Sequence, residues 1–460
     1  MYVHNHSPWL RQLRRQKALA PLQHDVTVDV VIIGAGISGI STAYQILKET
    51  PKSVLLIEAD KVAHGATGHN AGQIASYFER SLWSMAEEYG VEQTCAAQRD
   101  VESAWEVIEE MVNTVGMDDQ YWTFTGYAGC TNLEQVVHYL KSNQVRREGG
   151  LPLQTLYIAE DSPWLHHLSA EYDGLFETCP LGTILEALNS DNLEYGAMLA
   201  NKKGCTNSAL FCEQVLLYLQ KTYWDRFQCV EKTPVDLVEV YETLAECHTK
   251  SGVVATGSHV VLCTNGFEHF RIENRHGGPI DARFHLEVEG KVGLMAGYIE
   301  ADLRPPMAVS YFPKDAEDPS EDAYFYVTRR PFVEGAETKT LLCIGGPDHP
   351  LDHHTYSRSE AYVNDFQTSI DDFVQHSYRH HPSIPVSYAF LWHGLMGYTK
   401  NRLRLIGHEP CNPVLLYNLG CNGVGILPSL FASTKIAGLL AGKTYAPSLF
   451  DPFKNTCSLE

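Results

Sequence analysis

Three glycines and one acidic residue near the start of the chain have the types and spacing of a dinucleotide-binding site. Gly34, Gly36 and Gly39 form the pattern G-x-G-x-x-G, and Glu58 follows about 20 residues later. The first glycine permits a tight turn, the second lets the backbone approach a pyrophosphate, and the third lets a helix pack closely against a strand. A carboxylate at Glu58 can accept hydrogen bonds from an adenosine ribose. These residues predict a bound dinucleotide; a Rossmann-like unit without its ligand is the alternative.

The elements around these residues occur in the order that such a site requires. Residues 28–33 are mostly β-branched, which is typical of a strand buried on both faces of a parallel sheet. Residues 37–48 are expected to form a helix whose N-terminal amides and dipole face the phosphates. Residues 54–57 are expected to form a second strand that ends at Glu58.

Two further loops of small residues could approach the same ligand. Residues 65–72 follow the second expected strand, and residues 420–425 separate an expected strand at 414–418 from an expected helix at 429–441. An NAD domain can be satisfied by its first strand–helix–strand unit. Three glycine-rich loops so far apart in sequence therefore favour a longer ligand, FAD.

Composition and charge narrow the class of protein. The 460 residues include 56 acidic and 35 basic ones, and the net charge of −21 disfavours nucleic acid or an anionic membrane as a partner. No apolar run approaches the ~18 residues of a membrane span, and no secretory signal is recognised, so we expect no membrane span and a cytoplasmic location. The twelve cysteines include no C-x-x-C pair, and we expect reduced thiols. No metal site is predicted, because His349, Asp352, His353 and His354 are interpreted as a polar loop.

The remaining pattern predicts an α/β protein. Two helices are expected within residues 81–115, and strands at 227–230, 235–241, 244–249 and 259–262. The last of these resembles the opening strand and is placed in the same sheet. Strands at 285–298, 323–329 and 339–344 have no crossover helices between them, which favours antiparallel pairing. A helix is expected at 357–376.

Taken together, these motifs resemble the D-amino-acid oxidase-like family of FAD-dependent oxidoreductases, which includes sarcosine oxidases, dimethylglycine dehydrogenases and glutamylputrescine oxidases. The resemblance extends over residues 28–442 and also rests on Thr233-Pro-Val235, on residues 260–266 and on the segment from Trp392 to Gly407. It implies a Rossmann-type FAD-binding domain and a mainly antiparallel-sheet substrate domain with interleaved segments. We expect an N-terminal arm at 1–24, FAD-binding segments at 25–81, 191–268 and 392–446, substrate segments at 82–190 and 269–391, and a tail at 447–460.

The resemblance implies a role for individual residues. Val235 would bind adenine through its backbone, Glu58 the ribose, and Gly36, Ile37 and Ser38 the pyrophosphate. Beside the ribityl chain and the flavin would lie Thr67, Gly68, His69, Asn70, Ala71 and Gly72. Gly423, Val424 and Gly425 would present amides at a helix start to the flavin N1 and C2 carbonyl, where charge develops on reduction.

The sequence departs from the family pattern in two places. Family members often carry Arg where His69 stands, and Asp and Pro where Asn401 and Arg404 stand; the second departure is expected to lie nearer the substrate. The cysteine that binds flavin in monomeric sarcosine oxidases is absent, since Leu395, Met396 and Gly397 occupy the corresponding segment. His69 has the spacing of the histidine that binds flavin in dimethylglycine dehydrogenases. We expect noncovalent FAD, with a covalent bond through His69 as the alternative.

The expected reaction is oxidation of the C–N bond of an amine or amino acid to an imine, with oxygen or a redox carrier as electron acceptor. Alternatives are dehydrogenation of a hydroxy acid and an FAD-binding protein without oxidase activity. No catalytic acid or base is identified in the sequence. Tyr326, Arg329 and Trp392, with Tyr311 and Tyr324, are candidates for the substrate pocket, although aromatic residues in strands more often belong to a core.

Overall fold

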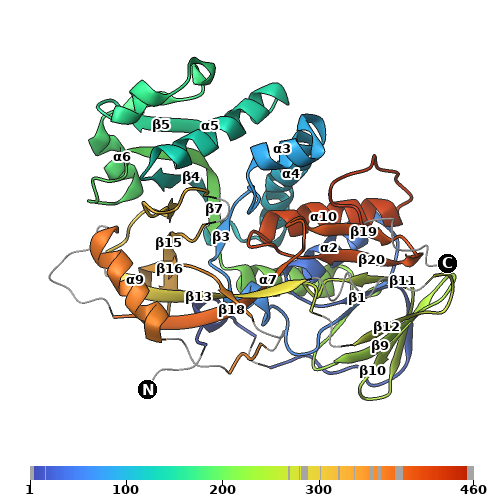
Figure 1. The fold of residues 1–460 in the computed structure, drawn as a ribbon. Helices are drawn as coiled ribbons and strands as arrows, with labels where there is room; N and C mark the ends of the chain where they lie inside the picture. Colours follow the sequence, from blue (N-terminus) through green and yellow to red (C-terminus); the bar gives the residue numbers. More distant parts are fainter. Residues whose placement is uncertain are drawn as a thin grey trace.

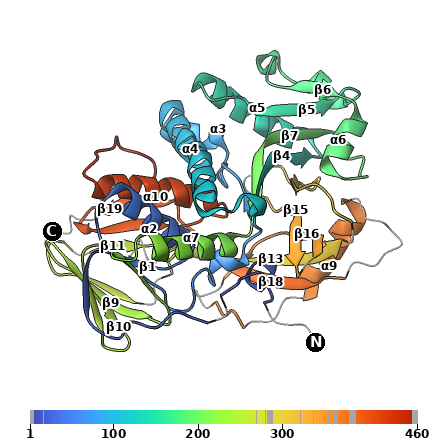
Figure 2. The same ribbon diagram turned by 180° about the vertical axis from the view of Figure 1, so that it is seen from behind.

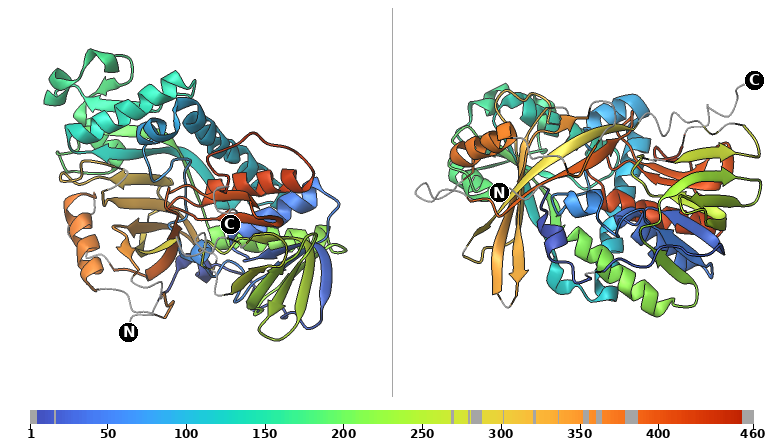
Figure 3. Two further views of the ribbon diagram at one scale, coloured as in Figure 1. Left: turned by 45° about the vertical axis from the view of Figure 1, so that its right-hand side comes forward. Right: turned by 90° about the horizontal axis from the view of Figure 1, so that it is seen from below.

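Two β-sheets organise the computed structural model, one to the right and one to the left in Figure 1 and exchanged in the reverse view of Figure 2. The structure describes residues 5–15, 17–267, 270–278, 280, 288–300, 302–319, 322–335, 337–351, 356–359, 364–378 and 387–452. The long strand β13 (Glu289–Glu300) extends from the second sheet towards the first (Figure 3).

The first sheet is built around the opening strand of the dinucleotide-binding motif. β1 runs parallel to β2 and to β11, and β11 is also parallel to β20. The predicted placement of the strand that ends at residue 262 beside the opening strand is therefore confirmed. The strands are β12 (Arg271–Asn274), β9 (Val235–Val240), β10 (Ala245–Thr249), β11 (Val254–Leu262), β1 (Val26–Ile33), β2 (Val54–Ile57) and β8 (Phe227–Val230), with β20 (Asn412–Leu419) on β11 and β19 (Leu405–Glu409) on β20.

Alternate residues of β1 are buried on opposite faces of this sheet. Val30 and Ile32 belong to the core formed with α2 (Ile37–Glu49), α4 (Val91–Val115), α7 (Ser208–Thr222) and α10 (Ile426–Leu440). Val31 and Ile33 pack instead with apolar side chains of the β9–β10 hairpin and of β20. A strand covered on both faces must be apolar throughout, which is why this segment lacks the alternation of a half-exposed strand.

The second sheet is mainly antiparallel, as the sequence predicts. β13 pairs antiparallel with β16 and β18, and β15 pairs antiparallel with β14 and β16. Its strands are β17 (His349–Pro350), β13, β16 (Glu337–Gly345), β15 (Phe325–Glu334), β14 (Met307–Tyr311), β4 (Tyr121–Cys130), β7 (Ala197–Thr206), β5 (Thr155–Ala159) and β6 (Glu177–Cys179), with β18 (Phe390–Tyr398) on β13 and β3 (Gln73–Ile74) on β7. Part of the expected strand 285–298 lies outside the described residues.

Five further helices and four short 3₁₀ turns complete the part of the chain that the structure describes. They are α1 (Pro8–Arg11), α3 (Leu82–Tyr89), α5 (Leu133–Glu148), α6 (Leu181–Leu188) and α9 (Asn364–His376), with short 3₁₀ turns η1 (Ala66–His69), η2 (Asp118–Gln120), η3 (Pro163–His167) and η4 (Ala170–Tyr172). The two helices expected within 81–115 are α3 and α4. The described part of the expected 357–376 helix begins at Asn364, and residues 357–359 are not helical.

Several elements have partners that differ from the expected segments, and one of them is β3, which falls in the FAD-binding segment 25–81 yet pairs with β7 in the second sheet. β7 and β18 fall in segments assigned to the FAD-binding domain, yet both pair within the second sheet. α4 falls in a substrate segment, yet its buried face shares a core with α2 and α10. Periodicity identifies the buried face of each element but not its partner, which explains these differences.

The cysteines and the helices bear on two further expectations. Ten cysteines in the described part are free, whereas Cys411 is disulfide-bonded, so the expectation of reduced thiols throughout was wrong at this position. Among the helices that the structure describes, none combines the length and the apolar character needed to cross a bilayer.

Candidate functional site

A cavity of about 800 Å³ lies where the strands of the first sheet end and the second sheet begins. The ends of β1, β2 and β11 open into it through Gly34, Glu58 and Thr264. Parallel sheets bind ligands at the carboxyl ends of their strands, so this is the expected location for a nucleotide. Most of the predicted cofactor residues line the cavity: Gly34, Gly36, Ile37, Ser38, Glu58, Thr67, His69, Asn70, Ala71, Val235, Gly423, Val424 and Gly425.

Three predicted glycines do not line the cavity but allow close packing beside it. A Cβ atom on Gly39 would lie 1.8 Å from the carbonyl oxygen of Gly34, so only glycine lets α2 begin this close to β1. Gly68 and Gly72 lie against Leu10 and Trp9, and Gly72 has a φ of +66°. Because these glycines have no Cβ atom, neighbouring atoms pack closely against them, and they do not contact the cavity.

Glu58 is fixed at the end of β2 by two backbone amides. Its carboxylate accepts hydrogen bonds from the amides of Ala35 and Asp60, both at 2.9 Å. Burial raises the pKa of Glu58, while the two amides act in the opposite direction. The carboxyl group is thus held at the cavity wall, where a ribose hydroxyl could reach it.

The start of α2 contacts two loops that are distant in sequence. The amide of Ile37 donates to Thr67 Oγ1 at 2.9 Å, so this predicted pyrophosphate donor is already bonded within the chain. Ser38 Oγ lies 3.0 Å from Ser429 Oγ in the first turn of α10 and accepts a hydrogen bond of 2.5 Å from Arg404. Arg404 was expected nearer the substrate; because it precedes β19 beside the end of β20, its side chain instead reaches the start of α2.

His69 faces the cavity with a defined tautomer. Its Nδ1 lies 2.9 Å from the carbonyl oxygen of Gly65, and a carbonyl only accepts, so Nδ1 carries the hydrogen. Burial lowers the pKa of His69 to about 4. The imidazole is therefore neutral near pH 7, and the lone pair on Nε2 remains available as an acceptor or a nucleophile.

The end of the cavity beside the Gly423–Gly425 loop contains two carboxyl groups that the sequence analysis missed. Tyr324 donates to Glu79 at 3.3 Å, and Tyr398 donates to Asp348 at 3.1 Å. A Cβ atom on Gly423 would lie 3.1 Å from Glu79 Oε1 and 2.8 Å from the Tyr398 hydroxyl, so both groups adjoin this loop.

Burial perturbs both carboxyl groups, and the charge of Asp348 also acts on Glu79. Burial, with the Asp348 charge second, raises the pKa of Glu79 to about 7, and burial raises the pKa of Asp348 to about 6. Lys291 and Arg402 also line this end, and the Lys291 ammonium lies 4.5 Å from the centre of the Tyr398 ring. Perturbed carboxyls in a cleft indicate a site for chemistry or binding, but no local motif marks them in the sequence.

Only part of the predicted substrate pocket faces this end. Tyr324 and Tyr326 line the cavity. Arg329 lies outside the lining, and its Nε donates to the carbonyl of Pro305 at 2.7 Å, because residues three apart in a strand point to opposite faces. Trp392 also lies outside the lining and donates to the carbonyl of Asn70 at 3.2 Å. Tyr311 is 1% exposed and belongs to the second sheet's core.

The N-terminal segment supports the 65–72 loop from behind. Trp9 is fully buried, and its Nε1 donates to the carbonyl of Asn70 at 2.6 Å. The ring of Trp392 contacts Trp9 edge-on with centroids 6.2 Å apart, and the Arg330 guanidinium lies 5.3 Å from the Trp9 ring centre.

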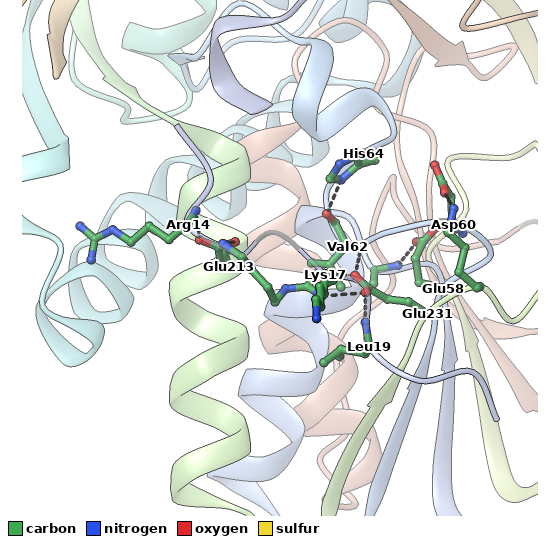
Figure 4. Close-up of polar contacts among 12 residues, drawn as sticks. Arg14, Lys17, Leu19, Glu58, Asp60, Val62, His64, Glu213 and Glu231 are labelled. Carbon is green, nitrogen blue, oxygen red and sulfur yellow. Dashed lines mark hydrogen bonds and ion pairs between the residues drawn. The ribbon is translucent and has the colours of Figure 1, made fainter. Parts of the chain in front are cut away.

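Two buried carboxylates hold the following residues of this segment (Figure 4). Glu231 accepts from the Arg15 guanidinium at 2.6 Å, from the amide of Val62 at 2.7 Å, and from the amide of Leu19. Glu213 on α7 accepts from the backbone amides of residues 14 and 15 at 2.8 and 2.9 Å. The segment is therefore fixed to α7 and, through Glu231, to the stretch of chain at Val62 that leads into the 65–72 loop.

Potential metal ligands lie away from the cavity. Within the described ranges, Glu239, Glu246 and His248 on β9 and β10 form the one such group, and Arg275 already pairs with Glu239. Of the polar loop considered in the sequence analysis, Asp352, His353 and His354 lie outside the described residues.

Comparison with known proteins gives a family and a fold. Residues 29–439 match the family described as FAD dependent oxidoreductase (DAO). Gamma-glutamylputrescine oxidoreductase of Escherichia coli is 26% identical over 121 residues, which is 26% of this chain and 28% of that protein. A probable oxidoreductase of Haemophilus influenzae is 23% identical over 251 residues, 54% of this chain and 51% of that protein. The matches thus span about half or less of these curated relatives.

A solved structure is similar over almost the whole chain. Glycine oxidase from Bacillus cereus superimposes with a TM-score of 0.62 and 17% identity, covering 91% of this chain and 96% of that one. At this identity the similarity shows the fold alone. It confirms the α/β architecture expected from the sequence.

Proposed function

Because the chain belongs to the DAO family of FAD dependent oxidoreductases, we propose that it oxidises the C–N bond of an amine or amino acid to an imine. Bound FAD would supply the two-electron oxidation. Most of the predicted FAD residues line one cavity of a size typical of ligand sites, and Gly39 provides the close helix start that a dinucleotide requires. The residues of this chain therefore fit FAD.

The observation that supports an amine is the charge at the end of the cavity beside Gly423. Glu79 and Asp348 complement an ammonium group, and Lys291 could hold a carboxylate of the same substrate. A hydroxy acid offers only the negative group. Tyr324 and Tyr398 hold the two carboxyls in place, so their positions would be fixed before a substrate arrives.

A proton must leave an ammonium substrate before its C–N bond is oxidised. The raised pKa of Glu79, about 7, suits a group that takes up this proton near neutral pH. We therefore assign proton uptake to the Glu79 carboxylate, and the Asp348 carboxylate would stabilise the positive charge that develops on nitrogen as the neutral amine is oxidised to the iminium form of the product.

Anaerobic bleaching of the flavin tests this reaction. Primary and secondary amines, amino acids and hydroxy acids are each added to the FAD-loaded protein without oxygen, and loss of the visible absorbance of oxidised flavin is recorded. We expect bleaching by amines or amino acids, weakened in Glu79→Gln and unchanged in Glu242→Gln, whose carboxylate is 73% exposed. Bleaching by hydroxy acids alone would contradict the proposed reaction. A protein that cannot be loaded with FAD would contradict any oxidase role.

We propose that FAD is bound noncovalently, with the neutral His69 imidazole as a hydrogen-bond partner. The alternative is a bond to His69 Nε2. Acid precipitation separates the two: a yellow supernatant supports noncovalent binding, whereas a yellow pellet that becomes colourless in His69→Ala would establish the bond.

The electron acceptor and the organisation of the chain remain proposals. Oxygen or a redox carrier would reoxidise the flavin, and peroxide yield compared with dye reduction distinguishes them.

The division into an FAD-binding and a substrate domain is proposed to follow the two sheets, with β7 and β18 in the second. The cytoplasmic location stays a prediction.

A further inference from the structure

Arg404 is a buried cation whose partners are all neutral. The residue is 4% exposed, and its guanidinium donates to Asn418 Oδ1 at 2.5 Å and to the backbone carbonyls of Asn418 and Gly420 at 3.0 and 3.2 Å. Its fourth contact is the Ser38 hydroxyl at 2.5 Å. Within the described residues no carboxylate forms an ion pair with Arg404.

A charge in this position is costly unless something neutralises it. Burial lowers the pKa of Arg404 only to about 10, so the group is charged at neutral pH. Hydrogen bonds to neutral groups offset part of the desolvation cost, but not the loss of a counter-charge. The chain by itself therefore leaves an uncompensated positive charge beside the cavity that Arg404 lines.

The surroundings of Arg404 add to the positive potential. Ser38 lies in the first turn of α2, and Ser429, which contacts Ser38 at 3.0 Å, lies in the first turn of α10. Both helices thus direct their N-terminal ends, with their partial positive charge, at the region that the guanidinium occupies. Gly36 and Gly425, which have no side chains of their own, line the cavity beside this region.

We propose that Arg404 is the counter-ion of the FAD diphosphate. The diphosphate is the part of FAD that carries permanent negative charge, and the planar guanidinium is suited to phosphate oxygens. The proposal rests on FAD as the cofactor and concerns a residue for which the family pattern implies no such role, because relatives often have Pro there. Arg404 would remain bonded to Asn418 and exchange or share its contact with Ser38.

Binding of FAD to the apoprotein tests the proposal without any turnover. Arg404→Met removes the charge and keeps most of the apolar stem. We expect FAD affinity, measured by quenching of flavin fluorescence, to fall about 10- to 100-fold. Riboflavin, which has no phosphate, should bind both proteins equally weakly. Arg147→Met, at an exposed position on α5, should bind FAD like the wild type.

Two further measurements separate this role from a structural one. Added salt should weaken FAD binding more in the wild type than in Arg404→Met, because a charge–charge contact is lost. The FAD-free variant should be at least as stable as the FAD-free wild type, since an unpaired buried charge has been removed. Arg404→Lys, which keeps the charge, should bind FAD more tightly than Arg404→Met.

Several results would overturn the proposal. One is FAD affinity within threefold of the wild type; another is an equal loss for FAD and riboflavin, which would indicate a damaged pocket. A third is an Arg404→Met variant that binds oxidised FAD as the wild type does but has a lower flavin reduction potential. In that case Arg404 would stabilise the anionic reduced flavin and not the diphosphate. A variant that fails to fold without FAD also contradicts it, because a more stable apoprotein is expected. Failure of the wild type to bind FAD would instead refute the proposed function.

Discussion

Replacing Trp9 with alanine should loosen the 65–72 loop from behind. Trp9 is completely buried, and its Nε1 bonds to the Asn70 carbonyl while its ring packs against Trp392 and Arg330. Deletion of a buried tryptophan side chain typically costs about 3–5 kcal/mol of unfolding free energy, because apolar contacts are lost and a cavity remains. We expect a loss in this range, and weaker FAD binding because Asn70 and Ala71 line the cavity.

The assay is urea unfolding of the FAD-free protein, followed by tryptophan fluorescence and by circular dichroism. Trp224→Ala is the matched control, because this side chain is 79% exposed and its removal should change the unfolding free energy by less than about 0.5 kcal/mol. Trp9→Phe keeps most of the packing and removes the indole N–H, so it should lose about 1 kcal/mol for the hydrogen bond in addition to its smaller ring.

A second substitution tests whether Trp9 and the loop are coupled. In Gly72→Ala the new Cβ would lie 2.7 Å from Trp9 Cη2, so alanine should cost less stability when Trp9 is already alanine. The relief is partial, because Gly72 has a φ of +66° and its Cβ would also approach Thr206. If Trp9→Ala were no more destabilising than Trp224→Ala, the N-terminal segment would not support the loop.

Three further changes test other contacts. Burial would raise the pKa of Glu231, but its hydrogen bonds hold that pKa below the ordinary carboxyl value. Glu231→Gln should therefore lower the free energy of unfolding by about 2 kcal/mol at pH 7. In urea unfolding this difference from the wild type should disappear as the pH falls below the ordinary carboxyl range, where Glu231 becomes protonated. Gly39→Ala should abolish FAD binding in an absorbance assay, because its Cβ would overlap a carbonyl oxygen, whereas Gly182→Ala has open space and should bind normally. Titration of the flavin spectrum should reveal a group near pH 7 that is absent in Glu79→Gln and present in Glu242→Gln.

The sequence predicts the central strands of the first sheet, but it does not predict which of the two sheets every other strand joins. The strands expected at 28–33 and from residue 259 are recognisable because each contains a short apolar run, residues 30–33 and 260–262, that is buried on both faces of the sheet. β7 contains charged residues at 202 and 203, and residues 200–202 are partly or fully exposed. Its pattern of apolar and polar residues therefore fits a strand of either sheet. Its pairing with β4 is a contact between distant parts of the chain, and local periodicity carries no information about it.

The cofactor half of the site follows from motifs, whereas the other half does not. The glycines and Glu58 act through backbone geometry, which leaves a fixed spacing in the sequence. Glu79 follows β3 and Asp348 lies between β16 and β17, so the two line one cavity only because the second sheet brings these distant strands together, and neither residue belongs to a motif. Arg329 could have been set aside from the sequence alone, since it stands an odd number of residues from Tyr326 in one strand.

The order of strands in the first sheet has a consequence during synthesis. β1 is made early, but its neighbour β11 follows roughly 200 residues later, which takes on the order of 10–40 s at ribosomal rates of 5–20 residues per second. During that interval one apolar edge of β1 has no partner and could pair with another nascent chain. β20 and the Gly423–Gly425 loop emerge later still. Cofactor capture must therefore follow almost complete translation, and early protection of the β1 edge would set the yield of correctly assembled protein.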